Sequence, residues 1–144
     1  MISKSHKYGY IALCGILIIA IGYRFYLWDV FFGWEESDYG NIAMVQGVKE
    51  SNFTHYDMNH MPGYYGLAAL LLFVVDDSIF ASKLAATLGG SASLLLLAWL
   101  MKQFSHLGAA IILTLCLSIQ PEFSLYASSA LREPVYTFFL VLML

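Results

Sequence analysis

Charge is scarce in this chain: Asp, Glu, Lys and Arg make up only 12% of its 144 residues, whereas 60% are hydrophobic. Soluble domains carry about 25% charged and about 45–50% apolar residues. A soluble fold of this length could not bury so much apolar surface. The net charge of −3 also gives no basic surface for a nucleic acid. The composition therefore predicts an integral membrane protein without a nucleic-acid partner.

Cysteine is rare as well, with only two residues. Cys14 and Cys116 lie in separate apolar runs, which predicts small buried hydrophobic residues rather than a disulfide or a metal pair. Apolar residues follow one another without the period-two alternation of a barrel strand. Since lipid requires the backbone polar groups to be bonded internally, we predict an all-α integral membrane protein.

Familiar motifs of soluble enzymes are missing too. The sequence contains no Walker loop, no dinucleotide-binding fingerprint, no HExxH and no CxxC. Cytosolic nucleotide chemistry therefore has no support, and no metal ligand set is predicted.

Long apolar runs dominate what is present. They predict a polytopic helical bundle forming one module over residues 1–144, and the spans are expected at about residues 8–28, 63–78, 79–101, 107–127 and 134–144 onward. Asp76, Asp77 or Ser78 is expected to cap the third run. The fifth run still continues at Leu144. We therefore expect the N-terminal part of a longer protein, inactive on its own.

Basic residues suggest an orientation. Lys4 and Lys7 precede the first run, so the positive-inside rule places the N-terminus in the cytoplasm and residues 29–62 in a loop on the outer face. Arg24 fits an outer interfacial belt of Tyr and Trp side chains. If all runs cross, Lys102 lies outside. If the short second run does not cross, Lys102 turns inside and residues 120–133 return to the outer face, which the same rule favours.

The outer loop gathers acids. The stretch WEESDYGNIA, residues 34–43, places Glu35, Glu36 and Asp38 within four residues, and a short interfacial helix is expected over 38–48. One interpretation is a solvated acidic loop. The other is a carboxylate at the membrane surface whose pKa is raised by desolvation, which suits a general base.

Two further stretches combine polar and aromatic residues at a span boundary. HMPGYY leads from the loop into the second run, and its His60 is either a phosphate or carboxylate contact or part of an interfacial belt. Arg132-Glu133-Pro134 opens the fifth run. Arg132 either binds a phosphate or pairs structurally with Glu133 or Glu122.

Together these stretches resemble the N-terminal part of a C-type glycosyltransferase, in the broad family of protein O-mannosyltransferases and lipid A aminoarabinose transferases. Glu35-Glu36-x-x-Tyr39-x-x-x-Ala43 is similar to that family's Asp-Glu pair, tyrosine and small residue. The chain departs from the pattern at Glu35, where aspartate is usual, and Asp38 is the alternative. HMPGYY resembles the entry to the next helix, and Lys83 stands where the family has arginine. Residues 118–134, which end in Arg132-Glu133-Pro134, are similar to the family's Ser-x-Pro to Arg-x-Asp/Glu stretch.

The resemblance implies an inverting hexosyl- or pentosyltransferase that moves a sugar from a polyprenyl- or dolichyl-phosphate donor to a lipid, glycan or protein hydroxyl. It implies the following roles: Glu35 as base with Asp38 as substitute, Glu36 as orienting group, Tyr39 and Glu133 near substrate, and His60, Lys83 and Arg132 near the phosphate. The lipid tail would lie between spans, along runs such as Leu67–Val75. Some relatives use a divalent metal and others do not, so a metal stays open.

Two other classes of function compete with a transferase. A transporter would need acids buried at the middle of the membrane, whereas most acids here fall in the loop. A non-catalytic assembly subunit would be a short chain with a true C-terminus, and the run that continues at Leu144 argues against it.

Overall fold

The computed structural model describes residues 4–30, 36–50, 62–128 and 132–143, with side chains except those of residues 4–6, 29–30, 36–40 and 62. Within these ranges all regular secondary structure is helical, which confirms the all-α prediction. Two segments, Lys7–Trp28 and Ser78–Phe104, are long and apolar enough to cross a membrane. In chain order the helices are α1 (Lys4–Val30), α2 (Glu36–Lys49), α3 (Pro62–Leu71), α4 (Ser78–Phe104), α5 (Leu107–Ile119), α6 (Pro121–Tyr126) and α7 (Glu133–Leu142).

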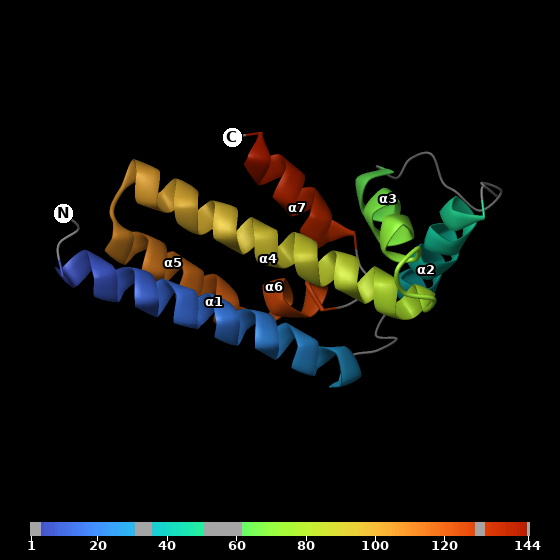
Figure 1. The fold of residues 1–144 in the computed structure, drawn as a ribbon, viewed down its shortest axis with the longest axis horizontal. Coiled ribbons are helices and arrows are strands. Elements are labelled where there is room, and N and C mark those ends of the chain that lie inside the picture. The colour runs from blue at the N-terminus through green and yellow to red at the C-terminus, as the bar shows by residue number, and fades with distance from the viewer. Residues whose placement is uncertain (1–3, 31–35, 51–61, 129–131, 144) are drawn as a thin grey trace.

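Helices α1 and α4 form a long antiparallel pair (Figure 1). At one end the Lys102 ammonium lies 5.1 Å from the centre of the Tyr10 ring. Nearer the other end the Trp28 indole N–H donates to the Thr87 hydroxyl at 2.9 Å. Helix α5 packs beside α1, and α7 crosses α4 near its middle (Figure 1). The bundle thus has one end with the N-terminus and another where α1 ends and α4 begins.

Local signals set the helix boundaries. The Asp77 carboxylate accepts hydrogen bonds from the backbone N–H groups of Ile79 at 2.8 Å and Phe80 at 3.1 Å, so the predicted cap of α4 is confirmed. Pro121 opens α6, where a missing N–H costs nothing, and the run expected over residues 107–127 is divided there into α5 and α6. Helix α2 extends slightly beyond the expected residues 38–48.

The second apolar run forms a shorter helix than expected. Helix α3 ends at Leu71, and its ten residues extend only about 15 Å, half of a bilayer's hydrocarbon core. Figure 1 shows α2 and α3 side by side at the end of the bundle where α4 begins. Helix α3 is therefore shorter than the span expected over residues 63–78.

A buried core joins these short helices to α4. The Tyr65 hydroxyl donates to the Asn41 side-chain oxygen at 2.7 Å, which ties α3 to α2. The Lys49 ammonium donates to the Leu72 carbonyl at 3.3 Å and lies 3.6 Å from the Asp76 carboxylate. The apolar members of this core are Val45, Tyr64, Tyr65, Ala68, Leu72, Ala81, Ala85, Ala86 and Val135. Helix α2, which contains residues 36–43 of the acidic stretch, is therefore anchored on the first turns of α4.

The prediction that the two cysteines are buried is wrong, although both are free thiols as expected. Cys14 and Cys116 are both exposed on the surface of the bundle. In a chain rich in apolar residues an outward position can be as hydrophobic as an inward one, so an apolar run does not by itself place its members in the core.

Two glycines permit other helices to approach α4 closely: Gly89 admits α7, and Gly90 admits the end of α6. A Cβ atom at Gly89 would lie 2.7 Å from Val135 Cγ2 and 2.9 Å from Val135 Cα. At Gly90 it would lie 2.5 Å from the Ala127 Cβ. The Ser93 hydroxyl adds a hydrogen bond to the Pro134 carbonyl at 3.2 Å. The small-residue stretch of α4 thus acts as a packing surface, as such residues do between helices in lipid.

We expect Gly89→Ala to destabilise the bundle by about 1–3 kcal/mol, because the added methyl group meets backbone atoms of α7 that cannot move independently. Gly22→Ala is the matched control, since nothing lies within 4 Å of a Cβ there. That change should be neutral or stabilise α1 by about 0.5–1 kcal/mol. Unfolding midpoints in detergent measure both, and equal midpoints for the two variants would contradict the packing role of Gly89.

Candidate functional site

Arg24 is fully buried between α1, α4 and α6. One guanidinium nitrogen, Nη1, donates to the Ser91 hydroxyl at 2.9 Å, and the guanidinium carbon lies 5.2 Å from the centre of the Phe123 ring. The other two nitrogens, Nε and Nη2, have no hydrogen-bond partner. In the described part of the chain only one other buried side-chain polar atom, the Ser82 hydroxyl oxygen, lacks a partner. The prediction that Arg24 belongs to an interfacial belt is wrong.

Polar side chains of α1 and α4 meet along one line, which we call the polar seam: Arg24 and Trp28 of α1 with Lys83, Thr87 and Ser91 of α4. Lys83, Thr87 and Ser91 follow one another at four-residue intervals and therefore share a face of α4. The buried Lys83 ammonium donates to the Trp28 carbonyl. The Thr87 hydroxyl accepts from Trp28 and donates to the Ala127 carbonyl at 2.9 Å. The seam thus joins α1, α4 and the end of α6.

The break between α5 and α6 places Phe123 against Arg24. Pro121 has no N–H to continue the α5 ladder, and the Ser124 hydroxyl donates to the Ser118 carbonyl at 2.9 Å instead. The Ser128 hydroxyl donates to the Ser124 carbonyl at 2.9 Å. Serine hydroxyls therefore donate hydrogen bonds to backbone carbonyls that lose their helical partners at the break. An apolar environment requires such replacement because it offers no water.

The polar seam contains two buried cations and no described carboxylate. Neither the Lys49–Asp76 pair nor the Arg132–Glu133 pair involves Arg24. The acids whose side chains the structure describes, Glu50, Asp76, Asp77, Glu122 and Glu133, are all exposed. A buried charge without a counter-ion costs several kcal/mol in an apolar medium, so such groups at membrane depth are treated as functional. The Arg24 guanidinium, whose Nε and Nη2 have no hydrogen-bond partner, is therefore suited to receive an anion.

The predicted site residues divide into three groups. Glu35 and His60 lie outside the described residues. Glu36, Asp38 and Tyr39 belong to the first turn of α2, with their side chains outside the described part. Lys83, Arg132 and Glu133 are described in full.

The structure brings Lys83 into the polar seam and places Arg132 at the start of α7. Arg132 lies 3.7 Å from the Glu133 carboxylate, as one interpretation of the sequence predicted, in a half-exposed pair of the kind that contributes little to stability. Glu122 is exposed. Because α7 begins against Gly89 and Gly90, the pair lies close to the part of α4 that carries Thr87 and Ser91. Among the described residues, no group of three or more His, Cys, Asp or Glu side chains could hold a metal ion.

Sequence reasoning missed Arg24, Thr87 and Ser91. The signal for Arg24 was present, because an ionisable residue inside an apolar run is expensive unless it has a function. The hydroxyls of α4 carried no such signal, since serine and threonine are ordinary residues at helix contacts in lipid. Comparison of the chain with protein-family models, with curated proteins and with solved structures gave no match.

Proposed function

We propose that the chain belongs to a membrane glycosyltransferase that moves a sugar from a polyprenyl- or dolichyl-phosphate donor to an acceptor hydroxyl on the outer face. The observation that supports this most is the buried Arg24 guanidinium, which has two unpartnered N–H donors and no described carboxylate nearby. A guanidinium offers the paired donors that match a phosphate. Such a group inside a candidate span suits a phosphate that is carried by a lipid.

The chemistry needs a base on one side of the sugar and cations on the other. The acceptor oxygen attacks the anomeric carbon from the face opposite the lipid phosphate, and its proton passes to Glu35, or to Asp38 in its place. The bond between the anomeric carbon and the phosphate oxygen breaks, and the lipid phosphate leaves with the electron pair. Fixed positive charge stabilises that leaving group.

The remaining residues have supporting roles in this proposal. Arg24, Lys83, Arg132 and His60 provide positive charge for the phosphate, while Glu36 orients the base or the acceptor. Tyr39 and Glu133 contact substrate. Helix α2, in which Glu36 and Asp38 lie, packs against α4, the helix that provides Lys83. The acids and the cations of the proposal thus come from neighbouring elements.

A transporter with an acidic ion path has less support. Such a path needs buried carboxylates, whereas the described acids are exposed and the buried ionisable groups, Arg24 and Lys83, are cations.

The proposal is tested by the choice of donor. Membranes containing the full-length protein would be given either hexosyl and pentosyl prenyl phosphates or the corresponding nucleotide sugars, and released prenyl phosphate and glycosylated product would be measured by mass spectrometry. We expect product only from the prenyl-phosphate donors, compared with membranes that lack the protein. Product from nucleotide sugars alone, or none from any prenyl-phosphate donor, would rule the proposal out.

A further inference from the structure

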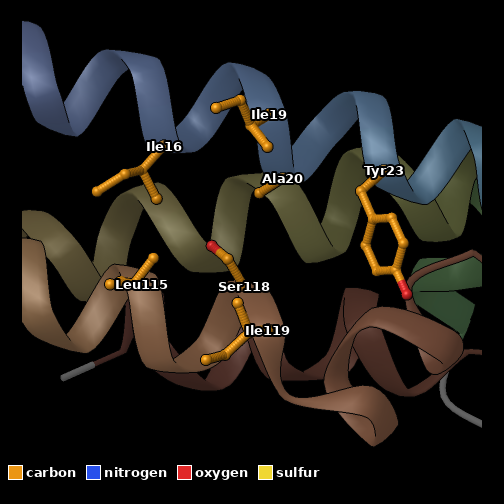
Figure 2. Close-up of a pocket in the computed structure, with 7 residues that line it drawn as sticks. All are labelled: Ile16, Ile19, Ala20, Tyr23, Leu115, Ser118 and Ile119. Carbon is orange, nitrogen blue, oxygen red and sulfur yellow. The ribbon is translucent and has the colours of Figure 1, made fainter.

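An apolar groove of about 330 Å³ runs between α1 and α5. Its walls are residues 16–23 of α1 and 115–119 of α5, and we call it the α1–α5 groove. Figure 2 shows the small Ala20 and Ser118 side chains facing each other across it, with Tyr23 at one end. The groove is open on one side, where Ile19 and Ile119 are both exposed at the surface of the bundle.

The buried cation lies at one end of this groove. Ala20 lines the groove, and Arg24 follows one helical turn later, about 6 Å along α1. Phe123, whose ring lies against the Arg24 guanidinium, packs on the cluster that contains Ala20. The groove therefore ends within about one helical turn of Arg24, whose Nε and Nη2 have no hydrogen-bond partner.

We propose that the α1–α5 groove holds the first part of the isoprenoid chain of a prenyl phosphate, with the phosphate bound by Arg24. This inference rests on the proposed function and assigns its lipid to a place on the chain. The sequence had suggested that the lipid tail follows residues 67–75. That path has less support, because α3 ends at Leu71 and residues 72–77 are not helical.

Size and charge both support this occupant. A volume of 330 Å³ is near the lower end of the ~300–1,000 Å³ typical of ligand sites, so the groove holds a short segment of a chain and leaves the rest in the bilayer. Nε and Nη2 can donate charge-assisted hydrogen bonds to the phosphate oxygens while Nη1 keeps its hydrogen bond to Ser91. Arg24 therefore favours binding of a lipid whose phosphate can come within hydrogen-bond distance of its guanidinium.

The test measures binding of farnesyl phosphate to the purified full-length protein in detergent. Farnesol, inorganic phosphate and phosphatidylglycerol are the comparison probes. Ile19→Trp places a bulky ring at the groove wall, and Ile18→Trp is the matched control, because Ile18 and Ile19 are 70% and 72% exposed but only Ile19 lines the groove. Arg24→Met removes the cation.

We expect farnesyl phosphate to bind at least about tenfold more tightly than farnesol or phosphatidylglycerol, a difference of about 1.4 kcal/mol. Ile19→Trp should weaken farnesyl phosphate binding at least about tenfold and leave inorganic phosphate binding unchanged, whereas Ile18→Trp should behave as the parent protein does. Arg24→Met should abolish the preference for farnesyl phosphate over farnesol.

Three results would overturn the inference: equal effects of the two tryptophan variants, equal binding of farnesol and farnesyl phosphate, or equal binding of phosphatidylglycerol, which would mean ordinary bilayer lipid. The assay needs neither sugar nor acceptor, so it separates two failures. Selective binding without sugar transfer removes the proposed function alone. Transfer that Ile19→Trp and Ile18→Trp leave equally intact removes the groove assignment alone.

Discussion

Replacing Arg24 with methionine is expected to reduce sugar transfer by the full-length protein by about 100-fold or more while leaving the protein folded. Removing one preorganised donor to a developing negative charge costs other enzymes a factor of about 10²–10³. The two unpartnered N–H groups of Arg24 make it the strongest candidate for such a donor among the described residues. Initial rates of transfer from a prenyl-phosphate sugar measure the loss.

The same substitution should raise the unfolding temperature in detergent. Methionine fills a similar volume and removes a buried charge that has no described carboxylate partner, and replacing buried ionic groups with apolar ones is often neutral or stabilising. Ser91, left without its partner, can bond to a carbonyl one turn back along α4. Activity lost together with stability would instead indicate that Arg24 serves only to hold α1, α4 and α6 together.

Lys102→Met is the control for this experiment. Lys102 is an exposed cation over the Tyr10 ring at the opposite end of the bundle, so its removal should leave both transfer and lipid binding unchanged. An equal loss of transfer in both variants would show that overall charge, rather than the buried position of Arg24, controls the reaction.

Glu35→Gln in the full-length protein is expected to abolish measurable transfer, with membrane insertion intact. Glutamine keeps the shape of the side chain but cannot accept the acceptor's proton, and a positioned general base contributes about 10²–10⁴ in rate. The measurement is the rate of transfer at saturating donor, with the amount of inserted protein determined in the same membranes.

Asp38→Asn and Glu50→Gln accompany that variant. Asp38 is the substitute base. If only Asp38→Asn lost sugar transfer, Asp38 and not Glu35 would be the general base. Glu50 is an exposed acid at the far end of α2, and its carboxylate accepts a hydrogen bond from Gln46 at 3.3 Å. Normal sugar transfer in all three variants would show that neither Glu35 nor Asp38 is the general base.

Helix boundaries could be predicted from the sequence because they depend on local chemistry. The Asp77 cap and the break before Pro121 each follow from groups within a few residues of the boundary. The orientation of Arg24 could not be predicted, because it depends on contacts with Ser91 and Phe123, which are 67 and 99 positions away in the sequence. A helix that is apolar on every side gives no periodicity from which to read its inward face. The two cysteines were misplaced for the same reason.

The length of α4 sets the depth at which the polar seam would lie in a bilayer. Twenty-seven residues extend about 40 Å, whereas a hydrocarbon core is about 30 Å thick. The first turns of α4 pack against α2 and α3 through Ala81, Ala85 and Ala86, so protein covers them there. Residues 87–104 then extend about 27 Å, close to the thickness of the core. Thr87, Ser91 and Arg24 would therefore meet the layer in which lipids carry their phosphates, so a membrane-bound donor would reach the guanidinium without leaving its own depth.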